Sequence, residues 1–181
     1  MCSTIRRRSG TPGRILRSRR YECEEDTEYF KPRSGSLAWE TNQSIRLTGS
    51  DVNPGLVRDG SVAGSANVDV DSSVYDKVRV RLKMTSRPSP LSAWEGAFQW
   101  YRAEDSPAFI SARTVYASAP DWNAMGDQSH VISWDLSGVS TWSSTVIGVR
   151  FDFFDFQSEA SYTNGTLEID YVRFESDDEQ T

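Results

Sequence analysis

The sequence has few of the residues that most often build metal and redox sites. Its 181 residues include one histidine, His130, and two cysteines, Cys2 and Cys23. A single histidine excludes the usual multi-histidine metal sites and leaves at most one histidine-centred catalytic group. Both cysteines lie near the N-terminus, where they could pair with each other but provide neither a disulfide framework nor a zinc-binding set.

Long apolar segments are also absent. No segment approaches the roughly 20 consecutive apolar residues of a membrane-spanning helix, so we expect no insertion into a membrane. Residues 1–20 hold only two sizeable aliphatic side chains, Ile5 and Leu16, and we expect no secretory signal peptide because the apolar segment of such a peptide is missing.

Signatures of catalysis are scarce as well. The sequence has neither a Gly-x-Ser-x-Gly nucleophile elbow nor a glycine loop that binds phosphate. The close acidic pairs Glu104–Asp105 and Asp152/Asp155 resemble the two carboxylates that a glycosidase uses. Such pairs are expected by chance in a chain with 26 acidic residues, so we predict that the protein is not an enzyme.

Charge is unevenly distributed along the chain, whose formal net charge is -6. Residues 1–20 contain seven arginines and no acidic residue, a charge of +7. Residues 21–181 contain the other 13 basic residues and all 26 acidic ones, a charge of -13. We therefore predict a basic arm joined to an acidic body. The arm's arginines are Arg6, Arg7, Arg8, Arg14, Arg17, Arg19 and Arg20.

Residues 1–35 are predicted to form this arm and an acidic hinge. The first 20 residues are rich in Ser, Thr, Gly, Pro and Arg and have little to bury, and acidic residues gather between Glu22 and Glu28. Three roles of the arm stay open: it folds back onto these acids, it forms bidentate pairs with carboxylates of neighbouring protein subunits, or it binds nucleic acid. Residues 176–181 are predicted to be an acidic tail.

Residues 36–175 show the alternation of β-strands. Val78, Val80 and Leu82 alternate with basic residues, which is typical of a strand with one buried and one wet face. Turn-forming residues separate several such runs, and no stretch has a sustained helical period. About eight short strands predict an all-β sandwich or barrel. The predicted strands are 37–48, 62–70, 78–84, 96–102, 108–117, 129–136, 147–153 and 166–174.

The last predicted strand breaks its own alternation. Leu167 and Ile169 share one face, whereas Val172 and Phe174 share the opposite one. A β-bulge near Asp170–Tyr171 would return both pairs to the core, so we predict a bulge there.

The body resembles carbohydrate-binding-module-like jelly rolls of the galactose-binding-like kind, which occur in polysaccharide-degrading enzymes and in viral appendage proteins. The resemblance covers some 140 positions and says nothing about residues 1–35. It implies a two-sheet antiparallel jelly-roll β-sandwich without catalysis of its own. The segments that carry it are 74–83, 99–101, 130–136, 142–152 and 165–174.

The resemblance also implies a possible structural Ca²⁺. In several such modules, an aspartate at the position of Asp170 ligates the ion together with a carboxylate near the first strand. Here Glu28 or Glu40 would supply that second carboxylate, since calcium prefers oxygen ligands. The alternative is that Asp170 caps the bulge and binds no ion.

Binding of a sugar needs an aromatic platform for its C–H face and polar groups for its hydroxyls. Trp134 and Trp142 lie within the family-like segments, so we expect them in the core or at its rim. Trp94 and Trp122 lie in predicted loops and are the better platforms. The predicted glycan-binding residues are Trp94, Trp100, Arg113, Tyr116, Asp121, Trp122 and Asn123.

The sequence therefore favours a non-catalytic glycan-recognition module that its N-terminal arm anchors in a larger assembly. The alternative is a purely structural virion protein, a surface decoration, appendage or capsid subunit whose arm docks on neighbouring subunits or nucleic acid. Either function predicts a location on a virion or at an extracellular surface.

Overall fold

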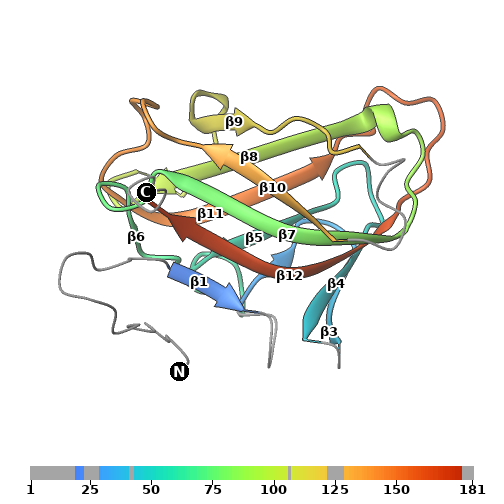
Figure 1. Cartoon of the computed structure of the whole chain (residues 1–181), viewed down its shortest axis with the longest axis horizontal. Coiled ribbons are helices and arrows are strands. Elements are labelled where there is room, and N and C mark those ends of the chain that lie inside the picture. Colours follow the sequence, from blue (N-terminus) through green and yellow to red (C-terminus); the bar gives the residue numbers. More distant parts are fainter. Residues whose placement is uncertain (1–18, 23–28, 41–42, 106, 122–128, 177–181) are drawn as a thin grey trace.

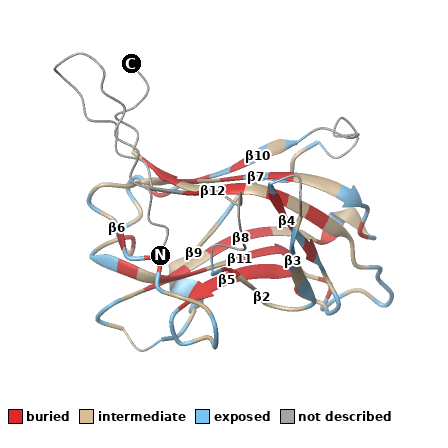
Figure 2. Cartoon of the chain, turned by 90° about the horizontal axis from the view of Figure 1, so that it is seen from below, coloured by how far each residue is buried: buried red, intermediate tan, exposed pale blue. Residues whose placement is uncertain are grey.

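The computed structural model describes residues 19–22, 29–40, 43–105, 107–121 and 129–176, with residues 19, 20 and 22 described by their backbone alone. Two six-stranded sheets lie face to face, and every strand pair in them is antiparallel (Figures 1 and 2). This arrangement confirms the predicted all-β jelly-roll sandwich. No helix in the described ranges is long and apolar enough to cross a membrane.

The first sheet, sheet A, has the strand order β10-β7-β12-β4-β3, and β1 pairs with the free part of β12 beside β4. Its central strands are the long β7 and β12, which pair along almost their whole length. The strands of sheet A are β1 (Arg19–Glu22), β3 (Ser36–Glu40), β4 (Ser44–Thr48), β7 (Lys77–Ser86), β10 (His130–Asp135) and β12 (Thr166–Glu175).

The second sheet, sheet B, has the strand order β2-β5-β11-β8-β9, and β6 pairs with one end of β11. Two short 3-10 turns, η1 (Leu91–Ala93) and η2 (Ser111–Arg113), precede β8 and β9. The strands of sheet B are β2 (Lys31–Pro32), β5 (Gly55–Asp59), β6 (Val70–Asp71), β8 (Trp94–Arg102), β9 (Thr114–Tyr116) and β11 (Thr145–Phe154).

Aromatic side chains fill the space between the sheets. Phe98 of β8 lies at their centre, with ring centroids 5.1 Å from Phe151 and 5.6 Å from Trp100. Trp134 and Trp142 are buried as expected, and their indole N–H groups donate to backbone carbonyls at 2.7 and 2.6 Å. Because each buried indole has a hydrogen-bond partner, these tryptophans contribute apolar area without an unsatisfied donor.

The predicted bulge in the last strand is confirmed. The pairing of β12 with β7 shifts between Ile169 and Tyr171, and the apolar side chains on both sides of the shift are buried. One extra residue therefore lets the strand keep its apolar face toward the core although the sequence alternation changes phase. These buried residues are Leu167, Ile169, Val172 and Phe174.

Three predicted strands differ from the structure. The range 37–48 forms two strands, β3 and β4, rather than one. In 62–70, residues 62–64 form bends and turns, residues 65–69 have no regular structure, and only Val70 belongs to a strand, β6. In 108–117, the 3-10 turn η2 comes first and only Thr114–Tyr116 form a strand, β9. Val68 and Val70, which suggested a strand, are nevertheless fully buried.

The sandwich also includes residues that the sequence analysis placed in the arm and hinge. Tyr21 of β1 is 5% exposed and its hydroxyl donates to the Val68 carbonyl at 2.9 Å. Phe30 is fully buried, and its ring meets the Tyr21 ring edge-on at 5.8 Å. Both rings belong to the core, so β1 is part of the sandwich. Arg19 and Arg20 therefore lie on a strand of sheet A rather than before the first strand. Residues 1–18, Glu28, Trp122 and Asn123 lie outside the described residues.

Candidate functional site

The outer face of sheet B carries polar side chains where β5, β8 and β11 run side by side. The alternation that buries Phe98 and Trp100 turns their neighbours outward, and Gln99 of β8 lies opposite Arg150 of β11. Asp152, two residues after Arg150 on β11, lies opposite Ala97 and is on the same face of the sheet as Arg150. We call the following set the polar face: Arg33, Glu95, Gln99, Tyr116, Arg150 and Asp152.

Asp152 is the centre of the polar face. Its side chain is 1% exposed. One carboxylate oxygen, Oδ2, forms ion pairs with Arg33 at 2.7 Å and with Arg150 at 3.0 Å. On the neighbouring strand, Gly55 leaves the room that Asp152 needs, because a Cβ there would lie 2.9 Å from Oδ1. Burial of a carboxylate is costly unless it is paired, so the two guanidinium groups offset the cost of burying Asp152.

Several polar atoms of the face have no hydrogen-bond partner among the described residues. They are Gln99 Oε1, Arg150 Nε and Asp152 Oδ1, two acceptors and one donor. Buried polar groups in proteins are almost always hydrogen-bonded, so three such atoms on two adjacent strands are unusual. These buried atoms add to the cost of burying charge on the polar face, as far as the described residues show.

Glu95 is the titratable member of the polar face. Burial, followed by the nearby charges of Asp152 and Asp155, raises the pKa of Glu95 to about 7, while the positive charges of Arg33 and Arg150 oppose that rise. The carboxyl group of Glu95 therefore changes its charge near neutral pH.

An aromatic contact borders the polar face near the end of β8. Tyr101 lies over Gly148 of β11, where the Cβ of any other residue would collide with its ring, and its hydroxyl donates to Asp59. Phe109 meets the Tyr101 ring edge-on at 5.2 Å, and the Arg150 guanidinium lies 5.1 Å from the Phe109 ring centre. Phe109 therefore restricts Arg150 on one side.

The segment that carries Phe109 is fastened to the sheet by a cluster around Asp105. Arg102 bonds both carboxylate oxygens of Asp105, from Nε at 3.0 Å and from an amino group at 3.1 Å. Arg113 reaches the same two oxygens at 2.6 and 2.9 Å. Hydrogen bonds from Arg102, with help from Arg113, hold the pKa of Asp105 at about 2. Both ends of the 105–113 segment are thus joined through one carboxylate.

Tyr116 provides an exposed aromatic ring at the other end of the polar face. It lies on the edge strand β9 opposite Ala97, and 67% of its surface is exposed. Such exposure of a large ring next to a cluster of buried charges is typical of a ligand-contacting position rather than of a core position.

The residues predicted to bind glycan separate into three groups. Tyr116 is exposed as a platform must be, whereas Trp100 is fully buried against Phe98 and cannot contact a ligand. The prediction that Trp100 binds glycan is therefore wrong. Its neighbour Tyr101 faces outward but is covered by Phe109. Trp94 is half-buried and packs on the core.

The polar candidates are also dispersed. Arg113 holds Asp105, and Asp121 is exposed in the segment after β9. Arg33, Glu95 and Gln99 were not among the residues predicted to bind glycan. A detectable signal was Arg150 and Asp152, which share the wet side of an otherwise aromatic strand.

The carboxylates predicted to ligate calcium are paired with arginines. Asp170 binds Arg81 at 2.9 Å, and Glu40 binds Arg46 at 3.3 Å. The described ranges contain no group of three or more His, Cys, Asp or Glu side chains that could hold a metal ion. Asp170 and Glu40 each face a cation, and Glu28, the other predicted partner, lies outside the described residues, so the calcium site stays a prediction.

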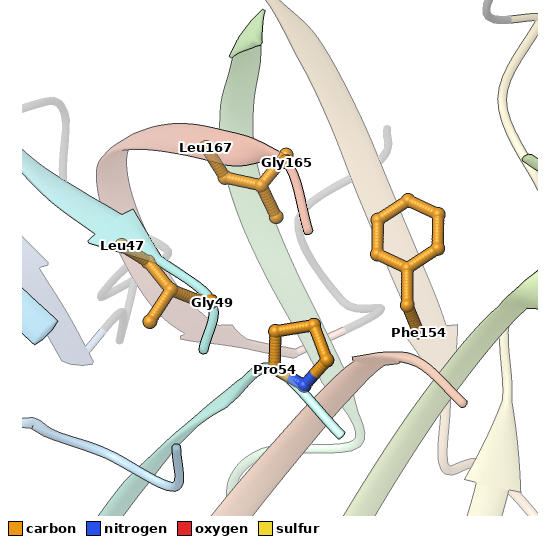
Figure 3. A pocket seen from close by; sticks show the side chains of 6 residues that line it. All are labelled: Leu47, Gly49, Pro54, Phe154, Gly165 and Leu167. Atoms are coloured by element: carbon orange, nitrogen blue, oxygen red, sulfur yellow. The ribbon is translucent and has the colours of Figure 1, made fainter. Parts of the chain in front are cut away.

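Two hollows lie away from the polar face. One is an apolar gap of about 10 Å³ between the ends of the two sheets, too small for a sugar (Figure 3). Its lining residues are Leu47, Gly49, Pro54, Phe154, Gly165 and Leu167. The other is an open depression of about 310 Å³ on the outer face of sheet A, whose wall includes the paired Arg81 and Asp170.

Comparison with known proteins finds similarity at the level of fold. No protein-family model and no curated protein matches the chain. A family 11 carbohydrate-binding module of the cellulosomal cellulase Lic26A-Cel5E of Clostridium thermocellum is 10% identical, with a TM-score of 0.51 over 89% of this chain and 95% of that one. At this identity the likeness shows a shared fold.

Two further structures have lower scores. The xylan-binding module CBM86 of Roseburia intestinalis is 13% identical, with a TM-score of 0.49 over 87% of this chain and 94% of that one. The Crh5 transglycosylase is 8% identical, with a TM-score of 0.44 over 88% of this chain and 84% of that one.

Proposed function

We propose that this protein is a non-catalytic glycan-binding β-sandwich whose ligand lies on the polar face of sheet B. The observation that carries the proposal is the 67% exposed ring of Tyr116 on the same face as Arg33 and Arg150, whose side chains are 28% and 21% exposed. Guanidinium N–H groups donate to sugar hydroxyls, so the ring and the two arginines offer both kinds of contact that a glycan needs.

Tyr116 completes the chemistry of such a site. Its exposed ring can pack against the C–H face of a pyranose, while side chains of the polar face bond the hydroxyls. The fold shared with a family 11 carbohydrate-binding module supports this function by analogy.

The experiment is a titration of polysaccharides and oligosaccharides against the full chain, after a glycan array has identified ligands. Tyr116→Ala should weaken binding about tenfold, the value of roughly 1.4 kcal/mol of lost ring contact, and Gln99→Ala should weaken it as well. Val131→Ala is the matched control, because Val131 is a 49% exposed apolar residue on sheet A. Equal affinities of Tyr116→Ala and Val131→Ala would reject the site.

The proposal includes anchoring of the module through its N-terminal arm. The chain enters the sandwich at β1, which belongs to sheet A, whereas the polar face belongs to sheet B. An arm that docks on neighbouring subunits at this end of the chain is compatible with a glycan on the opposite layer. Deletion of residues 1–18 should then abolish incorporation into the assembly and leave glycan affinity unchanged. Loss of both, or of neither, would contradict anchoring by the arm.

A further inference from the structure

Two arginines of the polar face share a single carboxylate oxygen. Asp152 Oδ2 lies 2.7 Å from Arg33 Nη1 and 3.0 Å from Arg150 Nη2. The two guanidinium groups bring two positive charges to this contact and the carboxylate brings one negative charge. Asp152 is 1% exposed, so a ligand meets the arginines rather than the carboxylate. The contact therefore presents more positive than negative charge to a molecule at the surface of sheet B.

Glu95 is the other acidic side chain that acts on these arginines. The strongest charges that act on Arg150 are those of Asp152, Arg33 and Glu95. Burial, followed by the charges of Asp152 and Asp155, raises the pKa of Glu95 to about 7. Glu95 is therefore mostly uncharged at pH 6, and it does not cancel the excess positive charge of the two arginines there.

Both guanidinium groups reach the surface. The Arg33 side chain is 28% exposed and the Arg150 side chain is 21% exposed. Arg150 meets Asp152 through Nη2, and its Nε is buried without a partner. Arg150 Nη1 has no hydrogen-bond partner among the described residues and is not one of the buried partnerless atoms. An anion at the surface can thus bond Nη1 while Nη2 keeps its contact with Asp152.

The exposed ring of Tyr116 lies across the strands from the two arginines. Tyr116 of β9 is opposite Ala97 of β8, which is opposite Asp152 of β11. Neighbouring strands lie about 4.8 Å apart, so β9 and β11 are about 10 Å apart. A disaccharide spans this distance, so adjacent sugars of one chain can meet the ring and the arginines at the same time.

Resting on the proposed function, we propose that the polar face binds an acidic glycan, in which a carboxylate or sulfate group of one sugar pairs with Arg150 and Arg33 and the neighbouring sugar packs on Tyr116. Hydrogen bonds from a guanidinium to an anionic oxygen are roughly twice as strong as those between uncharged groups. An acidic group therefore gains more here than a hydroxyl does. The chain as a whole carries a charge of -6, so this preference comes from the local pair of arginines and not from general attraction of anions.

The test compares acidic oligosaccharides with their uncharged forms on the full chain. Oligogalacturonates and glucuronic-acid-bearing xylo-oligosaccharides are titrated by calorimetry at pH 6 beside their methyl esters. Sulfated galacto-oligosaccharides are titrated beside their desulfated forms, which distinguishes sulfate from carboxylate as the anionic group. Wild type should bind the acidic form of at least one series about tenfold more tightly than its uncharged form.

Two variants with the same change of charge locate this preference. Arg150→Gln should reduce the preference to less than about twofold, because the pairing donor and its charge are gone. Arg81→Gln is the matched control, since Arg81 is 48% exposed in an ion pair on the outer face of sheet A. The Arg81→Gln variant should keep the wild-type preference.

Three outcomes would overturn the inference. Equal wild-type affinities for acidic and uncharged forms show that the face does not select an anion, while the proposed function stands. A preference that persists in Arg150→Gln, or that Arg81→Gln removes, shows that the anion binds elsewhere on the chain. Absence of wild-type binding to every form rejects the proposed function itself, and this inference with it.

Discussion

The two outer faces of the sandwich are both rich in charge but use it differently. On sheet A, Arg81 and Asp170 form an ion pair in which both side chains are open to water, 48% and 39% exposed. On sheet B, Asp152 is 1% exposed and lies between two arginines. Exposed pairs are screened and contribute little, whereas a buried carboxylate depends on its partners. Burial of its carboxylate, rather than charge, distinguishes the candidate site, because buried polar atoms without partners also occur on sheet A, at His130 and Arg173.

Removal of one carboxylate from each face should give the largest difference in stability between the two sheets. Asp152→Ala leaves Arg33 and Arg150 near each other without a counter-charge, so we expect a loss of about 3 kcal/mol in the free energy of unfolding. Asp170→Ala removes the equivalent partner from Arg81 in water and should cost less than about 1 kcal/mol. Urea denaturation of both variants measures the difference, and equal losses would show that the two faces are energetically alike.

Glu95 allows the comparison to be sharpened by pH. Burial and its acidic neighbours raise its pKa from 4.5 in the unfolded chain to about 7 in the fold, so between these values the folded state binds more protons. Its contribution to stability is therefore present below pH 4.5 and is lost as pH rises through 7. Glu95→Gln cannot ionise and should be more stable than wild type at pH 8 by about 1 kcal/mol, after allowance for solvent screening.

Urea denaturation of wild type and Glu95→Gln at pH 4, 5, 6, 7 and 8 measures this effect. The stability difference between the two proteins should be smallest at pH 4, grow between pH 4.5 and 7, and level off above pH 7. Glu168→Gln on sheet A is the matched control, because Glu168 pairs with Arg46 on the outer face of that sheet. A pH dependence of Glu95→Gln equal to that of wild type would contradict the assignment of the titration to the polar face.

Asp105 predicts the opposite pH response at the border of the polar face. Hydrogen bonds from Arg102 lower its pKa to about 2, so its contribution is complete above the unfolded value and is lost as pH falls toward 2. Asp105→Asn should therefore flatten the acid limb of the stability curve while costing about 1 kcal/mol at neutral pH. Thermal unfolding between pH 2 and 7 measures it, and an unchanged acid limb would show that the Asp105 cluster contributes nothing there.

The sequence predicts the sandwich well because alternation reports which side of a strand is buried. The outward Arg79 and Arg81 between buried valines and the bulge before Tyr171 both follow from that rule. The rule fails for short strands in charged surroundings. Tyr21 and Phe30 enter the core from strands of four and two residues or their flanks, which are too short for a period to appear.

The candidate site was harder to predict because its members come together only through folding. In the sequence, Asp152 resembles any other acidic residue, because its partner Arg33, in the loop after β2, comes close to it only in the folded chain. Loop position suggested that Trp94 is open, yet its indole N–H donates to the Ala117 carbonyl at 3.0 Å and its ring packs on Phe154 at 5.5 Å. Side-chain type predicts what a residue can bind, but its exposure depends on distant parts of the chain.

The smallest expected effect concerns the ion pair of Asp170. Arg81→Gln leaves Asp170 without its cation, but the exposure of both side chains limits the change in the free energy of unfolding to about 0.5 kcal/mol. Since Arg81 already balances Asp170, we expect 5 mM Ca²⁺ to leave the melting temperature of wild type equal to that in EDTA. A rise with Ca²⁺ that Asp170→Ala abolishes would restore the calcium site and show that Arg81 moves aside. Sheet A would then hold a ligand site as sheet B does, and the contrast between the two faces would end.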